Sequence, residues 1–450
     1  MDADVSLDTN LARTSRAELH RPLRDAVRWN FRAEFDRLQT SWRHRREPVE
    51  VNFRHIVPLG SGVDRATHLF HPYPAKLLLN IPLFFLSSPQ VAPKNSRVFD
   101  PFCGSGTVLV EALLAGHRAA GADANPLARL IAQAKTCHIP SFKLWQSLQS
   151  VLSEFHPGRS SEFSPVVKQE FWFTERVAAD LSALLYSIRQ NCDGHTLVFM
   201  EACFSSCVKR LSVSDPRLSV PVRLKGDALE AHLQSLPDVR TFFEKAVRLN
   251  IARLEKLPEQ ACAASLEFDA RHYAGGSEQA DLIITSPPYA GAQKYIRSSS
   301  LSIGWLGLAP DNQLRTLERQ NIGREHFSKL EYGSSSNVQD LGSDFLATIR
   351  SENPLRSHIA DVYLHEMNAA ADAITRRLAN SGHLVLVVGD NMICGRPFPT
   401  SALLKKIFLR KGLTVILELV DDIRSRGLMT KRNKTAGTIE REHVVVFQKV

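Results

Sequence analysis

The feature that most constrains the fold is an alternation of short apolar segments with stretches of helical periodicity. Apolar runs of this length and type are typical of buried strands. The expected strands are Arg97–Asp100, Ala119–Ala122, Asp281–Ile284, His383–Val388, Leu413–Leu419 and Glu442–Phe447. Helical patterns between strands favour βαβ units and hence an α/β fold with a mostly parallel sheet. The first helix is expected over Thr107–Ala115, with Gly116 at its end.

A glycine-rich turn follows the first strand and contains Gly104 and Gly106. Because glycine lacks a Cβ, such a turn lets the backbone approach a ligand closely. Leu109 occupies the position of the third glycine of dinucleotide-binding loops. No Gly-Lys-Ser/Thr follows the turn, so the lysine-bearing phosphate loop is excluded.

Two carboxylates flank this turn at the expected strand ends. Asp100 ends the first strand, and Asp123 ends the second, seventeen positions after Gly106 (123 − 106). A carboxylate at the second position can accept hydrogen bonds from both ribose hydroxyls of a nucleoside ligand. The acidic surroundings disfavour a pyrophosphate and suit a cationic sulfonium amino acid joined to adenosine. The alternative is structural: Asp100 caps the turn, and Asp123 caps a helix that begins at Pro126.

A second loop follows the strand Asp281–Ile284 and reads Thr285-Ser286-Pro287-Pro288-Tyr289. Taken alone, it is equally well explained as a rigid turn without chemistry. Together with the segment from Asp100 to Thr107, it resembles the S-adenosylmethionine-dependent amino-methyltransferases that act on DNA. The chain is most similar to the cytosine-N4 group, whose catalytic loop reads Ser-Pro-Pro-Tyr. Adenine-N6 members usually carry Asp or Asn where this chain has Ser286.

The resemblance implies a Rossmann-like class I methyltransferase fold and S-adenosyl-L-methionine as the cofactor. It implies a mostly parallel seven-stranded sheet with an antiparallel C-terminal strand, plus helical insertions. The segment from His71 to Lys76 resembles the part that helps to hold the methionine moiety, and Asp269 is placed to accept from the adenine amino group. The implied cofactor-binding residues are Tyr73, Lys76, Asp100, Pro101, Phe102, Cys103, Gly104, Gly106, Thr107, Asp123 and Asp269.

The implied catalytic residues are Ser286, Pro287, Pro288 and Tyr289. The amino nitrogen of a base is a poor nucleophile because its lone pair is delocalised into the ring. Acceptors aimed at its N–H groups, here the Ser286 hydroxyl and the Pro287 carbonyl, favour the pyramidal nitrogen of the transition state. Tyr289 can stack on the base, which must be flipped out or single-stranded. Carbon-5 methylation and zinc-dependent deamination are disfavoured, because the chain lacks Pro-Cys, His-x-Glu and Pro-Cys-x-x-Cys.

Six segments are expected along the chain. They are a basic N-terminal arm (1–50), the cofactor-binding half (51–140), a mainly helical insertion (141–262), the third cofactor element with the catalytic loop (263–305), a polar insertion (306–360) and the C-terminal half (361–450). Either insertion could recognise the target sequence. The arm is either an amphipathic helix with a solvated basic face or a contact to nucleic-acid phosphates.

The formal net charge of +9 favours a polyanionic partner. DNA contacts are expected from Lys294, Arg297, Arg424, Arg426, Lys431 and Arg432, although such clusters are equally well explained as solvated faces. Besides DNA, a cognate restriction endonuclease is an expected partner. The sequence has no apolar run of membrane-spanning length and no secretory signal pattern.

The seven cysteines are expected as reduced thiols, with Cys203 and Cys207 buried and no metal ion bound. These properties suit a cytoplasmic, nucleoid-associated prokaryotic protein. The expected activity is site-specific methylation of cytosine N4 in DNA, in restriction–modification or defence. The alternatives are adenine-N6 methylation of DNA, guanine-N2 methylation of RNA, and a non-catalytic DNA-binding protein that kept the fold.

Overall fold

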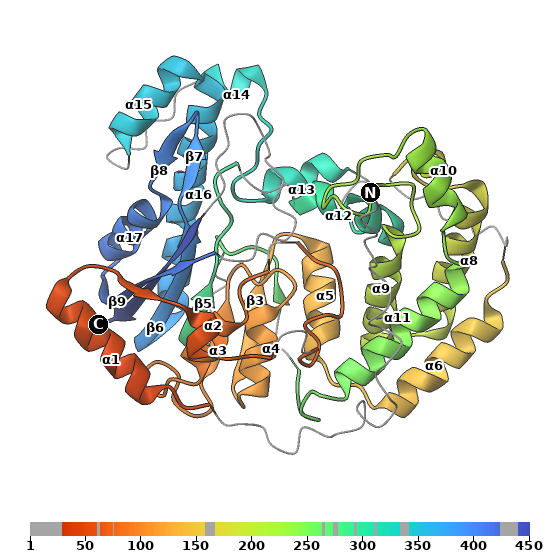
Figure 1. The fold of residues 1–450 in the computed structure, drawn as a ribbon, viewed down its shortest axis with the longest axis horizontal. Coiled ribbons are helices and arrows are strands. Elements are labelled where there is room, and N and C mark those ends of the chain that lie inside the picture. Colours follow the sequence, from red (N-terminus) through yellow and green to blue (C-terminus); the bar gives the residue numbers. More distant parts are fainter. Residues whose placement is uncertain are drawn as a thin grey trace, which may run out of the picture.

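The expected strands pair into one central sheet, which contains eight strands among the described residues (Figure 1). The computed structural model describes residues 29–60, 64–74, 76–157, 167–262, 266–272, 278–291, 295–309, 313–333, 342–423 and 440–450. The strands of the sheet are β1 (Val49–Val51), β2 (Arg97–Asp100), β3 (Arg118–Ala122), β4 (Leu266–Glu267), β5 (Ala280–Thr285), β6 (Leu378–Gly389), β9 (Leu413–Asp422) and β10 (Arg441–Lys449). A separate hairpin pairs β7 (Asn391–Ile393) with β8 (Arg396–Phe398).

The strand order is β1-β9-β10-β6-β5-β2-β3-β4. Strands β4, β3, β2, β5 and β6 are mutually parallel, and β10 runs antiparallel to both β6 and β9. Without β1, this is the expected seven-stranded sheet with a reversed C-terminal strand, and it is a class I methyltransferase-like fold. The addition is β1, which pairs in parallel with β9 at the edge of the sheet.

Alternation along the strands divides the apolar core between the two faces of the sheet. In β5, Leu282 and Ile284 pack into one layer and Ile283 into the other. In β6, Val385 packs into the same layer as Leu282 and Ile284, and Leu384 packs into the layer that contains Ile283. Successive side chains of a strand point to opposite faces, so a sheet covered on both sides needs apolar residues at every position. This is why the sequence showed continuous apolar runs at these strands.

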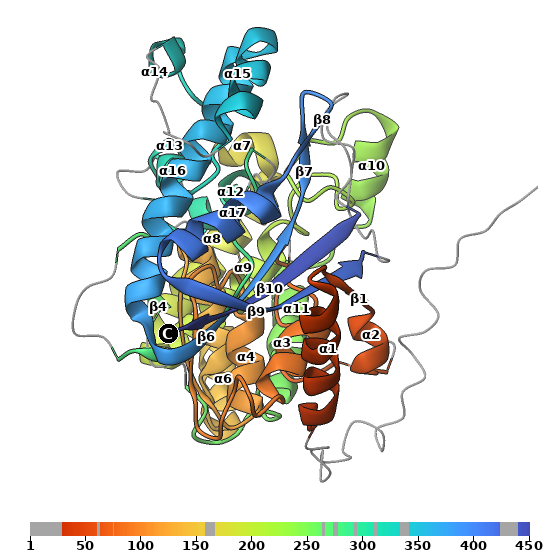
Figure 2. The same ribbon diagram turned by 90° about the vertical axis from the view of Figure 1, so that its left-hand side faces the viewer.

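Helices cover both faces of the sheet (Figure 2). Helices α1, α3, α4 and α5 lie on one side, and α16 and α17 lie on the other. Their bounds are α1 (Arg32–Arg45), α3 (Asn80–Leu86), α4 (Thr107–Leu114), α5 (Pro126–Thr136), α16 (Pro354–Arg377) and α17 (Thr400–Arg410), with the short α2 (Phe53–Ile56) after β1. Helix α4 ends as expected, because Gly116 follows it with φ +82°.

The helical stretch between α5 and β4 forms a bundle at one end of the sheet (Figure 1). Its helices are α6 (Ser141–Glu154), α7 (Gln169–Trp172), α8 (Glu175–Asn191), α9 (Gly194–Val208), α10 (Asp227–Gln234) and α11 (Val239–Leu254). Thr174 and Asp238 start α8 and α11 by accepting hydrogen bonds from the backbone amides of Val177 and Thr241. Helix α12 (Tyr295–Leu306), which follows the catalytic loop, packs against α9 and α5.

The described part of the expected N-terminal arm is a helix packed against the body of the protein. In α1, Phe35, Leu38 and Trp42 are buried, and Phe35 stacks on Phe84 of α3. Gln39 also donates a hydrogen bond to the carbonyl of Ile416 in β9. Helix α1 (Arg32–Arg45) is therefore amphipathic, with one buried face. The residues before Trp29 lie outside the described residues.

The expected polar insertion is partly helical. It contains α13 (Leu314–Gln320), α14 (Lys329–Gly333) and α15 (Ser343–Glu352). Helix α16 already begins at Pro354, with Asn353 as its N-cap, so the end of the expected insertion belongs to the helical layer of the fold. In the described part of the chain, no helix combines the length and apolar character that a bilayer crossing requires.

The burial of α1 generates a stability prediction. Leu38 is fully buried, and we expect Leu38→Ala to lower the free energy of unfolding by about 2–5 kcal/mol, because it removes apolar contacts and leaves a cavity. The matched control is Leu330→Ala on α14, where the leucine is 89% exposed and the change should be close to zero. Urea denaturation of both variants measures the difference. Equal stabilities would show that α1 is not part of the cooperative fold.

Candidate active site

The carboxyl ends of β2, β3, β4 and β5 meet at one edge of the sheet, where ligands bind in open α/β folds. A cavity at this edge is lined by residues that follow each of these strands. It collects eight of the expected site residues, namely Tyr73, Pro101, Phe102, Gly104, Asp123, Asp269, Ser286 and Pro288. The structure thus brings together the glycine turn, the carboxylates of Asp123 and Asp269 and the Ser-Pro-Pro-Tyr loop from segments that are far apart in the sequence.

The glycine turn is held in place by backbone hydrogen bonds. Gly104 and Gly106 have φ of +50° and +79°, which is the left-handed region that glycine adopts without strain. The amide of Cys103 donates to the carbonyl of Ala122 (2.9 Å), and the amide of Gly106 donates to the carbonyl of Cys103 (2.8 Å). A Cβ on Gly106 would lie 3.2 Å from the Cβ of Ala132 in α5. The second glycine therefore also permits close packing between the turn and a neighbouring helix.

Asp123 ties the turn to the end of β3. Its Oδ2 accepts from the amide of Gly104 (2.9 Å), and its Oδ1 accepts from the amide of Asn125 (2.8 Å). Because each carboxylate oxygen has two lone pairs, both oxygens keep acceptor capacity toward the cavity. Asn125 accepts from the amide of Leu127 and so caps α5. The alternative that Asp123 itself caps this helix is therefore wrong: the cap is Asn125, and Asp123 instead accepts from the amides of Gly104 and Asn125.

A buried hydrogen bond joins the cofactor turn to the catalytic loop. Thr285 ends β5, and its Oγ1 donates to Oδ1 of Asp100 (2.7 Å), which also accepts from the amide of Phe102 (3.1 Å). Strands β2 and β5 are adjacent and parallel, so their ends lie side by side. Asp100 thereby caps its own turn, as the structural interpretation expected, and also couples the two loops.

Both carboxylates have raised pKa values. Burial raises the pKa of Asp100 to about 7, although the hydrogen bonds from Thr285 and Phe102 act in the opposite direction. The recessed position of Asp123 raises its pKa to about 6, opposed by the amides of Asn125 and Gly104. Groups whose pKa lies near neutrality through burial are typical of functional sites. A ligand that donates hydrogen bonds or carries positive charge would favour their ionised forms.

Tyr73 is buried beside the glycine turn, where a Cβ on Gly104 would lie 3.6 Å from its ring. The side-chain amide of Asn125 donates to the Tyr73 hydroxyl (3.1 Å) and to Oγ of Ser299 in α12 (3.2 Å). Asn125 thus connects three segments around the cavity. Sequence reasoning missed both Asn125 and Ser299, since an Asn before a Pro signals only a helix cap.

Asp269 lines the cavity, but its carboxylate is strongly engaged by Arg271. The backbone amide and guanidinium of Arg271 donate to Asp269, with Nη2 at 2.7 Å from Oδ2. Burial raises the pKa of Asp269, and the hydrogen bonds and charge of Arg271 outweigh this and lower it. Arg271 also reaches Glu366 in α16 (3.0 Å) and the carbonyl of Gln320 (2.7 Å). Arg271 therefore fixes the third cofactor element against α13 and α16.

The segment after α13 packs against the catalytic loop. Ser286 and Pro288 line the cavity, whereas Pro287 is buried and Tyr289 is partly exposed. A Cβ on Gly323 would lie only 2.8 Å from the carbonyl oxygen of Tyr289, and Gly323 has φ +78°. Only a glycine therefore allows this close approach, and it supports the loop in one position.

Five expected cofactor residues do not line the cavity: Asp100, whose carboxylate is buried between the two loops, and four others. Cys103, Gly106 and Thr107 lie behind it in the turn and in the first residue of α4. Lys76 donates to the carbonyls of His68 (2.9 Å) and His71 (3.0 Å), so it braces the segment that carries Tyr73. Among the expected DNA contacts, Arg297 is exposed on α12. Lys294, Arg424, Arg426, Lys431 and Arg432 lie outside the described residues.

Buried ionisable side chains support the glycine turn, and the sequence did not predict them. Lys135 of α5 is fully buried, and its Nζ donates to the carbonyl of Ser105 (2.6 Å). Burial holds the pKa of this lysine well below its usual range. On α4, Glu111 accepts from Arg65 (2.8 Å) and contacts Nε2 of His68 (2.8 Å). Buried charges are retained where they are paired, and here they stabilise the backbone that forms the turn.

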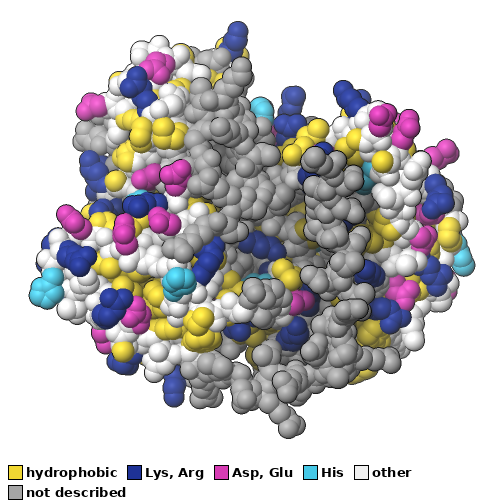
Figure 3. Space-filling model, viewed as in Figure 1, with side chains coloured by type: hydrophobic (Ala, Val, Ile, Leu, Met, Phe, Trp, Pro, Cys, Tyr) yellow, Lys and Arg dark blue, Asp and Glu magenta, His cyan; other side chains and the backbone are white. Residues whose placement is uncertain are grey.

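A second, larger cavity of about 530 Å³ adjoins the first and shares Tyr295, Asn321 and Ile322 with it. Its walls are α12, α13 and the segment after α13, which lie beside one another (Figure 1). Four arginines line it, namely Arg297, Arg315, Arg319 and Arg324, together with three glutamates. Arg324 is paired with Glu331 (3.0 Å). Elsewhere, on the face shown in Figure 3, basic and acidic side chains are interspersed over the described elements.

The raised pKa of Asp123 predicts a pH-dependent affinity for the expected cofactor. In the expected role of Asp123, ribose hydroxyls would donate to the ionised carboxylate, so protonation would compete with binding as the pH falls through about 6. We expect the dissociation constant for S-adenosylmethionine to rise roughly tenfold between pH 7 and pH 5. Asp123→Asn should bind more weakly at pH 7 and lose this part of the pH dependence. Isothermal titration across this pH range measures both, and an unchanged pH profile in Asp123→Asn would exclude the carboxylate as a ribose ligand.

Comparison with known proteins bears on the same elements. Residues 73–145, which include Tyr73, the glycine turn and Asp123, match a family model described as the RMKL-like methyltransferase domain. The chain is 23% identical over 437 aligned positions to the type II methyltransferase M.MvaI of Kocuria varians, covering 86% of this chain and 90% of that protein.

Similar solved structures include TrmN from Thermus thermophilus, with 12% identity and a TM-score of 0.31. The match covers 84% of this chain and 50% of TrmN, so the chain spans half the length of that protein. A TehB-like S-adenosylmethionine-dependent methyltransferase from Corynebacterium glutamicum matches with 11% identity and a TM-score of 0.27, covering 80% of this chain and 83% of that one. With the strand order and the family match over the cofactor turn, the chain is an S-adenosylmethionine-dependent methyltransferase related at a distance to M.MvaI.

Proposed function

We propose that the protein is a site-specific DNA methyltransferase that transfers a methyl group to the N4 amino group of cytosine. The observation that carries this proposal is the Ser286-Pro287-Pro288-Tyr289 loop, which is coupled through Thr285 and Asp100 to the cofactor turn. Ser286 and Pro288 line the same cavity as Asp123 and Tyr73. The nucleophile-positioning loop and the cofactor-binding residues thus meet, as direct methyl transfer requires. Similarity to a type II methyltransferase adds support.

In this proposal Tyr73, Asp123 and Asp269 bind the cofactor, which supplies an electrophilic methyl group on a sulfonium. The Ser286 hydroxyl and the Pro287 carbonyl accept from the N–H groups of the target amine. They thereby stabilise the positive charge that the nitrogen gains as it takes the methyl group, before it loses a proton. Tyr289 stacks on the flipped cytosine. Gly323 supports this arrangement by packing against the Tyr289 carbonyl.

The second cavity supplies a surface for the nucleic acid beside the catalytic loop. Arg315 and Arg319 are exposed, and they lie four positions apart on α13 and hence on one face. Arg297 extends from α12 toward the same cavity lining. Guanidinium groups bind phosphates in bidentate fashion, and such contacts position the strand without reading its sequence. We therefore propose that the phosphates flanking the flipped base bind at these arginines.

We further propose that the methylation protects DNA in a restriction–modification or defence system with a cognate endonuclease. The relation to a type II methyltransferase supports this setting. Methylation of adenine N6 is the alternative within the same chemistry, because the acceptors of the loop would serve any exocyclic amine. Ser286 favours cytosine, because adenine-N6 enzymes usually carry Asp or Asn at this position.

Product analysis tests the proposed reaction. Plasmid DNA incubated with the enzyme and S-adenosylmethionine is digested to nucleosides and analysed by mass spectrometry, with N4-methylcytosine as the expected product. N6-methyladenine as the sole product would overturn the base assignment. Methylation of RNA and not of DNA would overturn the substrate class.

The catalytic loop is tested by Ser286→Ala. Removing a transition-state acceptor should lower kcat by about 10²–10³-fold, with cofactor affinity changed by no more than about twofold. The control is Ser153→Ala, an exposed serine on α6, which should have the wild-type rate. Radiolabelled methyl transfer measures the rates, and a wild-type rate in Ser286→Ala would remove the loop from the mechanism.

The arginine surface is tested by the double variant Arg315→Glu/Arg319→Glu. Loss of two phosphate contacts should weaken DNA binding at all sequences and reduce the slope of log K against log[salt] by about 1–2. The control is Arg176→Glu/Arg240→Glu, which reverses two exposed arginines on α8 and α11. Fluorescence anisotropy over a salt series gives both slopes. An unchanged slope in the first variant would contradict the proposed surface.

A further inference from the structure

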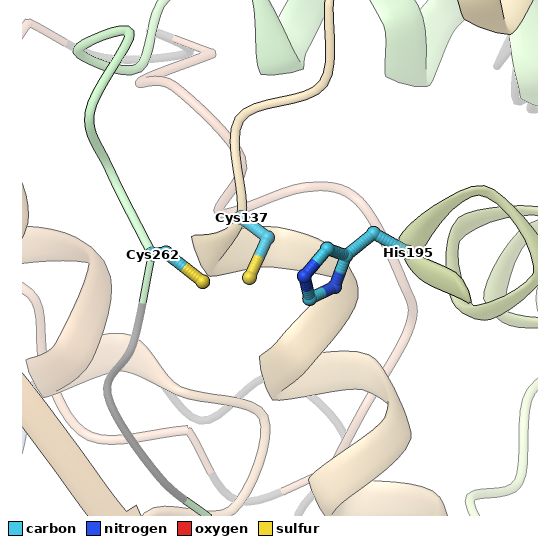
Figure 4. A group of neighbouring side chains, drawn as sticks. All are labelled: Cys137, His195 and Cys262. Atoms are coloured by element: carbon cyan, nitrogen blue, oxygen red, sulfur yellow. The ribbon is translucent and has the colours of Figure 1, made fainter.

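Three potential metal ligands from distant parts of the chain lie together outside the active site (Figure 4). They are Cys137, His195 and Cys262, whose sulfur and imidazole nitrogen atoms all lie within 4.8 Å of one another. Figure 4 shows their side chains pointing toward a common centre from three separate segments. Cys137 is buried, whereas His195 and Cys262 are exposed.

The backbone explains why these residues meet. Cys137 is the C-cap of α5, and the amide of its neighbour His138 donates to the carbonyl of Ala261 (2.8 Å). This bond places Cys262 beside Cys137. His195 lies in the first turn of α9, where the amide of Leu197 donates to the carbonyl of Asp193 and sets the start of the helix. Cys137 and His195 are thus placed by the end of α5 and the start of α9, and Cys262 by the hydrogen bond between its neighbour Ala261 and His138.

The donor set matches the chemistry of zinc. Two thiolates and one imidazole are the ligands that Zn²⁺ prefers, at bond lengths of about 2.0–2.3 Å. Ligand atoms on a tetrahedron of this size are roughly 3.4–3.8 Å apart. Atoms that already lie within 4.8 Å need to move inward by only about 1 Å or less to reach this geometry. Side-chain rotation alone can supply such a movement.

We propose that Cys137, His195 and Cys262 bind one zinc ion, with a water molecule as the fourth ligand. The exposure of His195 and Cys262 gives water access to the remaining position. Binding requires both cysteines as thiolates and so releases their protons.

The metal ion would link three separate segments of the chain. Cys137 ends α5 of the cofactor half, His195 belongs to the helical bundle, and Cys262 lies four positions before β4 (266 − 262). Strand β4 leads to Asp269, which lines the cofactor cavity. One zinc ion therefore connects the bundle to the cofactor half and limits the movement of the segment that carries Asp269. The inference does not depend on which base the enzyme methylates.

Metal analysis of the full chain tests the proposal. The protein is purified under reducing conditions, loaded with ZnCl₂ and dialysed extensively against metal-free buffer. Mass-spectrometric elemental analysis should find about one zinc per chain in the wild type. Cys137→Ser, His195→Gln and Cys262→Ser should each retain less than about a tenth of that amount. The matched controls are His138→Gln, next to Cys137, and Cys394→Ser in the distant β7–β8 hairpin, which should bind as the wild type does.

A second measurement does not depend on the folding of any variant. Wild-type protein loaded with Co²⁺ should show the intense visible bands of a tetrahedral ion and a thiolate charge-transfer band, and a chelator should abolish both. Chelation should also lower the Tm of zinc-loaded wild type but not of His195→Gln. Wild type without retained zinc, equal zinc in all variants, or a weak octahedral cobalt spectrum would each overturn the proposal. So would a Cys137–Cys262 disulfide in peptides from protein purified under reducing conditions.

Discussion

The hydrogen bond from Thr285 to Asp100 is the interaction on which the active site depends. It is 2.7 Å long and buried, and it joins the ends of two neighbouring parallel strands whose loops have different tasks. One loop contributes Gly104 to the cavity, and the other is the loop for which we propose the acceptors of the target amine. Because in-line transfer demands a separation of only about 3–3.5 Å between the reacting atoms, an uncoupled movement of either loop would be costly for catalysis. A buried carboxylate with few solvent contacts is a rigid anchor for this purpose.

Supporting residues surround this anchor and act through backbone carbonyls and amides. Lys135 holds the carbonyl of Ser105, and Arg271 holds Asp269 and the carbonyl of Gln320. Each is a long side chain that donates to a backbone carbonyl of another segment. A backbone fixed in this way stays ordered in the absence of ligand, so less binding energy is spent on ordering it.

The sequence predicted the strand–turn–helix units well because local signals coincide there. The strand Arg97–Asp100 has the apolar pair Val98 and Phe99 at its centre and is followed by glycines at positions that need positive φ, and both properties appear within ten residues. Strand β1 was not predicted, because three residues carry too little periodicity and its pairing with β9 spans the whole chain. Lys135, Asn125 and Arg271 were missed for a related reason: their partners are set by tertiary packing. The Cys137–His195–Cys262 cluster shows no motif, since its members are 58 and 67 positions apart (195 − 137 and 262 − 195), and the sequence therefore led to no expectation of a metal there; the zinc site remains our proposal.

The pairing of β1 with β9 has a consequence for the solution behaviour of the chain. An outer strand with unpaired amides and carbonyls is a template for association with another molecule, and natural sheets cover or shorten such edges. Here the ten-residue β9 is covered along part of its length by β1 and packed by α1, while β1 itself is only three residues long and so leaves a short outer edge. The N-terminal region thus helps to prevent edge-to-edge pairing of this sheet with the sheets of other copies. A protein engineered to begin beyond Val51 would keep every active-site residue and yet acquire a long open edge prone to aggregation.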